Sequence, residues 1–162
     1  MTIISDRPIG EDSRPPLVAL IIGWAGVVPF VAAALAPLVL SDYGTVAFLS
    51  LAGGVYAALI LSFLGGIRWG MAMSPLWASD RTLGFALSIL APSAGWLALL
   101  IPRIEGLSLL IVAFLLQGWL DLRAVGEGRA PMWYGPLRIR LTAAAVVALV
   151  VTMVSEVAII PL

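Results

Sequence analysis

The sequence predicts an all-α integral membrane protein, a five-transmembrane-helix bundle with a cytoplasmic N-terminus and a periplasmic C-terminus. Three observations predict this fold class. Of the 162 residues, 62% are hydrophobic and 11% are charged, and the mean hydropathy is +1.10; soluble domains are about 45–50% apolar and about 25% charged. Five long stretches of the chain are almost free of charge. The arginines gather on one side of the predicted bundle.

The chain divides into a short tail and one membrane domain. Residues 1–16 combine charges with three prolines and are predicted as a disordered cytoplasmic tail. Residues 17–162 are predicted as a single transmembrane domain. Its predicted spans are residues 17–40, 46–69, 82–101, 104–122 and 139–160. Most of them reach the about 20 residues that a helix needs to cross about 30 Å of hydrocarbon. They are continuously apolar, whereas the strands of a membrane barrel alternate.

The first and third spans contain features that bear on their structure. Ala34-Leu35-Ala36 resembles a signal-peptide cleavage site, but the apolar run before it exceeds the usual about 7–15 residues and Pro37 would follow the cut. A retained span is therefore favoured. Pro29 and Pro92 lie near the middle of the first and third spans. Each removes a backbone donor and predicts a kink, which is consistent with a ligand cavity or with ordinary helix packing.

The distribution of arginine predicts the orientation. Eight of the nine arginines lie in the tail, at the end of the second span and its loop, or in the loop before the last span. Five spans place these regions on one side and leave Arg103 on the other. The positive-inside rule assigns the arginine-rich side to the cytoplasm. Most tryptophans fall on the same side and are predicted to be interfacial anchors.

Small residues recur at every fourth position of the second span. They are Gly54, Ala58, Ser62, Gly66 and Gly70. Small residues allow two helix backbones to approach closely, a source of packing where lipid offers no hydrophobic drive. We predict a helix-packing seam against another span of the same chain, with a dimer interface as the alternative.

Two charged side chains stand out within the spans. Arg68 lies at the cytoplasmic end of the second span, where snorkelling to the headgroups is favoured over a lipid phosphate contact or a buried ion pair. Glu156 is the one acid within the apolar runs, the fourth of which is uncharged only over about 107–120, and its place near the far end of the last span predicts a hydrated carboxylate. These two residues are predicted on opposite faces of the membrane and cannot pair.

An interfacial aromatic-basic patch is predicted at the cytoplasmic face. Its members are Arg68, Trp69, Trp133, Tyr134, Arg138 and Arg140. Attraction to anionic lipid, about 1 kcal/mol per arginine near the surface, would hold such a patch at headgroup depth. The alternative is that Arg138 and Arg140 serve only to orient the last span.

Missing residue types exclude several kinds of chemistry. The chain has no Cys, no His and no Lys. Disulfides, thiol nucleophiles, the usual zinc sites and imidazole acid–base catalysis are therefore excluded. We expect no catalytic residues, no metal site and no cofactor, and no residue is assigned to cofactor binding. No basic run indicates nucleic acid binding; the expected partners are membrane lipid and other membrane-protein subunits.

Two stretches of sequence carry a family resemblance. One runs from Tyr56 to Gly70 and contains Ser-Phe-Leu-Gly-Gly-Ile-Arg-Trp-Gly; the other runs from Ala130 to Arg138 and closes with Leu141-Thr142. Together they resemble the uncharacterised membrane family that includes transmembrane protein 69. The resemblance covers about Leu17 to the C-terminus. The family is found in proteobacteria and in mitochondria, and the resemblance implies a multi-helix inner-membrane protein with no established chemistry. We expect the bacterial inner membrane as its location.

Two functional hypotheses follow. The first is a non-enzymatic accessory subunit or assembly factor of a larger, energy-transducing inner-membrane complex, which suits the small size and the lack of catalytic residues. The second is a small hydrophobic ligand-binding or transport module, by analogy with the architecture of the tryptophan-rich sensory proteins. A membrane enzyme is the least favoured class.

Overall fold

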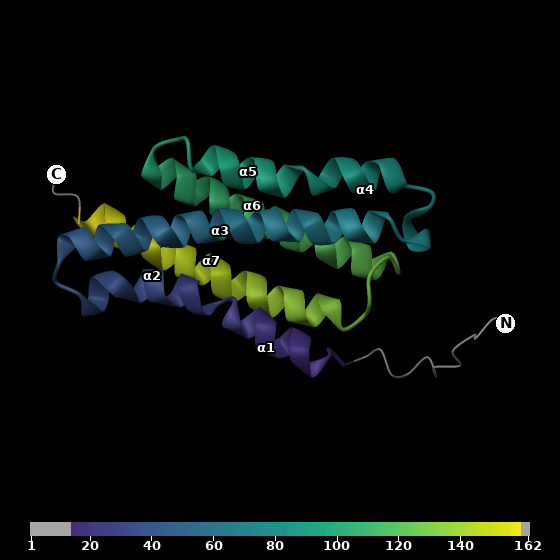
Figure 1. Ribbon diagram of the computed structural model, residues 1–162, viewed down its shortest axis with the longest axis horizontal. Helices are drawn as coiled ribbons and strands as arrows, with labels where there is room; N and C mark the ends of the chain where they lie inside the picture. Colours follow the sequence, from purple (N-terminus) through teal and green to yellow (C-terminus); the bar gives the residue numbers. More distant parts are fainter. Residues whose placement is uncertain (1–13, 160–162) are drawn as a thin grey trace.

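The computed structural model describes residues 14–159, and in this part of the chain the ordered elements are all helical, without a strand (Figure 1). The predicted tail lies largely outside the described residues. The helices are α1 (Leu17–Ala25), α2 (Val28–Val39), α3 (Tyr43–Ala72), the 3-10 helix η2 (Pro75–Trp77), α4 (Arg81–Ser88), α5 (Leu90–Ala98), α6 (Arg103–Gly126) and α7 (Tyr134–Ile159).

Four stretches of the described chain are long and apolar enough to cross a membrane. They are Leu17–Val39, Tyr43–Ala72, Arg103–Gly126 and Tyr134–Ala158. The predicted span at 82–101 is instead divided between α4 and α5, neither of which is long enough alone. α6 and α7 extend beyond the predicted spans at the arginine-rich end, so Arg138, which lies just before the last predicted span, is also on a helix.

Proline accounts for both breaks within the apolar runs. Pro29 has no N–H to donate to the carbonyl of Ala25, and Pro92 has none to donate to that of Ser88. These carbonyls belong to the last residues of α1 and α4. Each break therefore falls where the missing i to i−4 hydrogen bond ends the helix, which confirms the predicted kinks.

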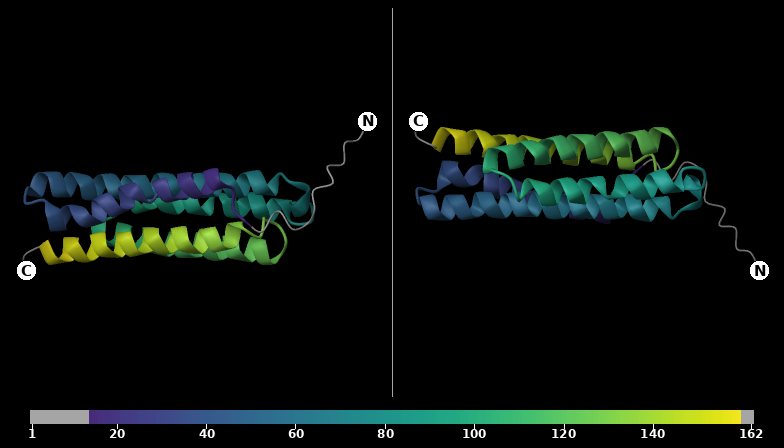
Figure 2. Two further views of the ribbon diagram at one scale, coloured as in Figure 1. Left: turned by 90° about the horizontal axis from the view of Figure 1, so that it is seen from below. Right: turned by 90° about the horizontal axis from the view of Figure 1, so that it is seen from above.

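The helices pack side by side along the length of the molecule (Figures 1 and 2). α1 with α2, α3, α4 with α5, α6 and α7 each run opposite to the one before (Figure 1). α6 and α7 form one side of the bundle, while α3 packs against α2, α4 and α5 on the other (Figure 2). Phe30, Leu61, Leu107 and Phe114 are buried between the two sides. Many large apolar side chains face outward, as expected in lipid.

Glycine determines how closely α3 approaches α5. A Cβ atom on Gly65 would overlap the carbonyl oxygen of Ser88 and lie 2.7 Å from Cδ of Pro92. A Cβ atom on Gly95 would lie 3.1 Å from Cα of Ala58. The carbonyl that loses its partner at the Pro92 break therefore rests against a helix position that only glycine can occupy without displacement.

The predicted seam on α3 is only partly correct. Gly54 and Ala58 are buried against other helices, but Ser62, Gly66 and Gly70 are exposed. A Cβ atom on Gly66 or Gly70 would meet nothing within 4 Å. A four-residue step advances about 400° around a helix with 3.6 residues per turn, so four steps rotate the stripe by about 160°. The stripe leaves the packed face, and the expectation of a continuous intramolecular seam is wrong.

Adjacent glycines on α3 provide a matched test of this packing. Gly65→Ala should lower the free energy of unfolding by about 1–3 kcal/mol, because the methyl group overpacks the contact with the Pro92 break. Gly66→Ala should be neutral or stabilising by about 1 kcal/mol, because alanine favours helix and the space is open. Unfolding in detergent measures both. Equal stability of the two variants would contradict the α3–α5 contact.

Candidate functional site

The central polar feature of the bundle is a buried cluster of two arginines and one aspartate. Arg68 of α3 donates from Nη2 to Oδ1 of Asp121 at 2.9 Å, and Arg138 of α7 donates from Nε to Oδ2 at 2.7 Å. The side chains of Arg68 and Asp121 are each 1% exposed, and that of Arg138 is 6% exposed. One carboxylate of α6 thus links three helices.

Two neutral donors complete the shell of this carboxylate. Gln117 donates from Nε2 to Oδ1 at 2.9 Å, and the hydroxyl of Tyr134 donates to Oδ2 at 3.2 Å. Helical spacing explains the arrangement, since Gln117 precedes Asp121 by four residues and Tyr134 precedes Arg138 by four. Each pair therefore occupies one face of its helix. We call Arg68, Gln117, Asp121, Tyr134 and Arg138 the Asp121 cluster.

The Asp121 cluster contains more positive than negative charge. Two guanidinium groups oppose one carboxylate, giving a formal charge of +1. Nε of Arg68 and Nη2 of Arg138 are buried and have no hydrogen-bond partner among the described residues. Unsatisfied donors and excess charge are costly in a low-dielectric interior. The cluster therefore has an unmet capacity to bind an anion or a hydrogen-bond acceptor.

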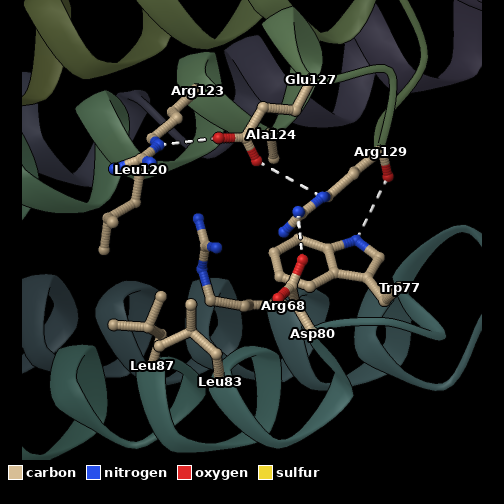
Figure 3. A pocket seen from close by; sticks show the side chains of 10 residues that line it. All are labelled: Arg68, Trp77, Asp80, Leu83, Leu87, Leu120, Arg123, Ala124, Glu127 and Arg129. Carbon is tan, nitrogen blue, oxygen red and sulfur yellow. Dashed lines mark hydrogen bonds and ion pairs between the residues drawn. The ribbon is translucent and has the colours of Figure 1, made fainter.

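A pocket of about 260 Å³ adjoins Arg68, between α4 and α6 (Figure 3). Arg68 extends into it, between Leu120 of α6 and the side chains of Leu83 and Leu87 of α4 (Figure 3). The rest of the lining is mainly polar and consists of Trp77, Asp80, Arg123, Ala124, Glu127 and Arg129. We call this the α4–α6 pocket.

Ion pairs connect the polar residues of the α4–α6 pocket. Arg129 pairs with Asp80 and with Glu127, and Arg123 pairs with Glu127 at 2.8 Å. Arg129 also lies 4.7 Å from the ring centroid of Trp77. The hydrogen bond from Arg123, followed by the charge of Arg129, lowers the pKa of the Glu127 carboxyl. A lowered pKa keeps the carboxylate ionised to lower pH, so these pairs persist until the pH falls through that pKa.

A second, more apolar pocket of about 300 Å³ adjoins Arg138. We call it the α1–α3 pocket. It is lined by Ile22, Gly23, Gly26, Val27, Phe30, Tyr56, Ile60, Phe63, Leu64, Phe114, Arg138, Leu141 and Ala145. It lies beside the break before Pro29, where α2 packs on both α3 and α7 whereas α1 packs on α7. The hydroxyl of Tyr56 donates to the carbonyl of Gly26 at 3.0 Å and supports the break.

Another polar cluster lies at the opposite end of the bundle. Arg103 donates from Nε to Glu156 at 2.9 Å and from Nη2 to the carbonyl oxygen of Ser50 at 2.5 Å, and the hydroxyl of Ser50 donates to Glu156. Gly54 allows this approach, because a Cβ there would lie 2.6 Å from Nη1 of Arg103. Among residues 14–159, no group of three or more acidic side chains is placed to hold a metal ion.

Both predictions for single charged residues are corrected. Arg68 does not snorkel to the headgroups. It is buried and paired with Asp121, because α6 supplies a counter-charge within its reach. Glu156 is 21% exposed and paired with Arg103 rather than freely hydrated. Asp121 was not predicted as a site residue. The pattern that could have indicated Asp121 is its spacing from Gln117. The two residues are four positions apart on the same helix, so their polar side chains share one face.

The predicted aromatic-basic patch divides into two groups. Arg68, Tyr134 and Arg138 meet at Asp121 inside the bundle. Trp69 and Arg140 are exposed outside it, and Trp133 is half-buried. Trp69 packs against Phe85, whereas Trp133 packs against Tyr134. The prediction of a single patch is therefore wrong, because half of its members hydrogen-bond to Asp121 inside the bundle.

The long apolar helices and the ionic cluster buried among them define a small multi-helix membrane protein. The chain matches the family described as "Protein of unknown function (DUF3429)" over residues 15–154, and it belongs to that family. The resemblance found in the sequence is thereby confirmed.

Two curated relatives are similar to this chain over most of its length. Transmembrane protein 69 of Xenopus tropicalis is 37% identical over 150 residues, which cover 87% of this chain and 55% of that protein. Transmembrane protein 69 of Mus musculus is 35% identical over 153 residues, covering 90% and 58%. The chain thus spans little more than half the length of these relatives. No solved structure matches it.

Removing the charge of Asp121 tests the cluster. Asp121→Asn leaves Arg68 and Arg138 buried without a counter-ion and should destabilise the protein by about 3–5 kcal/mol, measured by unfolding in detergent. Glu127→Gln removes an acid from an exposed ion pair on the same side of the bundle and should leave the unfolding midpoint unchanged. If both variants unfold like the parent, Asp121 does not hold the two arginines.

Proposed function

We propose that this protein is a non-enzymatic, multi-pass membrane protein that binds a small hydrophobic ligand in the α1–α3 pocket. The observation that carries this proposal is Arg138, a buried cation that lines an otherwise largely apolar pocket and whose Nη2 has no hydrogen-bond partner within residues 14–159. Such a combination suits a ligand with an apolar body and an anionic or hydrogen-bond-accepting end. Binding would satisfy a donor that is costly to leave unpaired.

The surroundings of the α1–α3 pocket favour entry from the lipid. Ile22 of α1 and Phe63 of α3 line it and are largely exposed on the apolar surface. Phe30 and Phe114 form an edge-to-face pair with ring centroids 5.7 Å apart at its buried side. An amphiphile could therefore insert its apolar part beside the aromatic rings and place its polar end near Arg138.

A second candidate function is that of an accessory subunit or assembly factor of a larger inner-membrane complex. Ser62, Gly66 and Gly70 favour it, since they form an exposed small-residue stripe with open space above its glycines. A helix from another protein could pack closely on such a surface. The same stripe could instead pack against a second copy of this chain, which is the dimer interface given above as the alternative for these small residues.

Purification in mild detergent separates these two functions. The ligand proposal predicts a small hydrophobic molecule that co-purifies with the parent and is lost from Val27→Phe, because the larger ring fills the α1–α3 pocket. Val154→Phe, on the exposed face of α7, is the matched control and should retain the molecule. Mass spectrometry of the extracted protein is the measurement. No bound molecule, together with a stoichiometric protein complex, would contradict the ligand proposal and favour the second.

We also propose five membrane crossings in a bacterial inner membrane, with α4 and α5 together forming the third. The alternating directions of the helices and the arginines at one end of the bundle support this topology. A reporter fused after Leu162 should read as periplasmic, and one inserted in the loop at 127–133 should read as cytoplasmic. A cytoplasmic C-terminus would contradict both the number of crossings and the orientation.

A further inference from the structure

The geometry points to a second binding site, for a phosphate group, in the α4–α6 pocket beside Arg68. This inference goes beyond the proposed function, since the two pockets share no lining residue. Arg68 is almost completely buried and extends into the pocket (Figure 3), and its Nε has no hydrogen-bond partner in the part of the chain that the structure describes. It is therefore a prepositioned donor.

The charges of the lining favour an anion. Three guanidinium groups face two carboxylates, which gives the lining a formal charge of +1. Both carboxylates are already engaged, Asp80 by Arg129 and Glu127 by Arg123 and Arg129. Behind Arg68, Asp121 is shared with Arg138 and so offsets only part of the positive charge. An incoming anion therefore meets arginine groups whose charge is not fully neutralised.

Guanidinium chemistry and the size of the pocket indicate a phosphate group. Arginine binds phosphate oxygens through several N–H donors held in a plane. The volume of about 260 Å³ is slightly below the about 300–1,000 Å³ of drug-sized ligand sites, so it suits a small group. Leu83, Leu87 and Leu120 line the pocket beside the charges. They offer apolar contact to the glycerol and chain of a phospholipid, whereas free phosphate would use only the arginines.

Titration of the purified protein with two probes tests this site and distinguishes the sources of phosphate. The probes are dioleoyl phosphatidylglycerol and inorganic phosphate, and binding is followed by native mass spectrometry and by the shift in unfolding temperature. Arg123→Gln should weaken binding about fivefold, because it removes one of the three guanidinium groups that line the pocket. Arg140→Gln removes an exposed arginine outside the pocket and should change binding less than twofold.

Arg68→Lys provides the sharper variant, because lysine keeps a charge beside Asp121 but lacks the Nε donor. Arg68→Lys should weaken binding of the probes at least tenfold. If this variant fails to fold, the comparison of probe binding by Arg123→Gln and by Arg140→Gln still tests the site. Binding of the lipid alone identifies a headgroup site, and binding of inorganic phosphate identifies a free-anion site. Val27→Phe should leave this binding intact, which separates it from the α1–α3 pocket. Absence of binding by both probes, or equal loss in Arg123→Gln and Arg140→Gln, would overturn the inference.

Discussion

The carboxylate of Asp121 is the interaction on which the arginine-rich end of the bundle depends. It accepts hydrogen bonds from α3 and α7 while belonging to α6, so three helices share one counter-ion. Both arginines depend on this one carboxylate, so losing contact with it would leave a buried charge unpaired, and that cost restricts how these helices can shift or rotate. Gln117 and Tyr134 occupy the remaining lone pairs and orient the carboxylate further.

A buried ionic cluster contributes little net stability to a fold, because the cost of desolvating the charges offsets much of the attraction between them. Here the balance is less favourable still, since two arginines share one aspartate and each retains an unpartnered nitrogen. Arg68 lines the α4–α6 pocket, and Arg138 lines both the α1–α3 pocket and a further apolar pocket of about 460 Å³ between α6 and α7. The cluster thus holds each of its two cations at the wall of a cavity, an arrangement suited to recognition rather than to packing.

The sequence predicted features that depend on local physics. Apolar runs revealed the long helices, and the missing N–H groups of Pro29 and Pro92 located the breaks to within one turn. Features that depend on rotation about a helix were harder to predict. A strict four-residue spacing suggested Gly66 for the packed face of α3, yet the accumulated rotation brings Gly65 there instead. Asp121 was missed because it lies at the end of an apolar run, where a charge resembles an interfacial residue.

A double-mutant cycle between Arg68 and Asp121 tests the central role of the cluster most directly. The parent, Arg68→Gln, Asp121→Asn and the double variant are unfolded in the same detergent, and the coupling energy is taken from the four stabilities. If the two buried charges interact directly, we expect a coupling energy of about 1.5–3 kcal/mol. The double variant should then lose less stability than the two single variants lose in sum. Losses that add to within about 0.5 kcal/mol would show that the two side chains do not interact, and the account would fail.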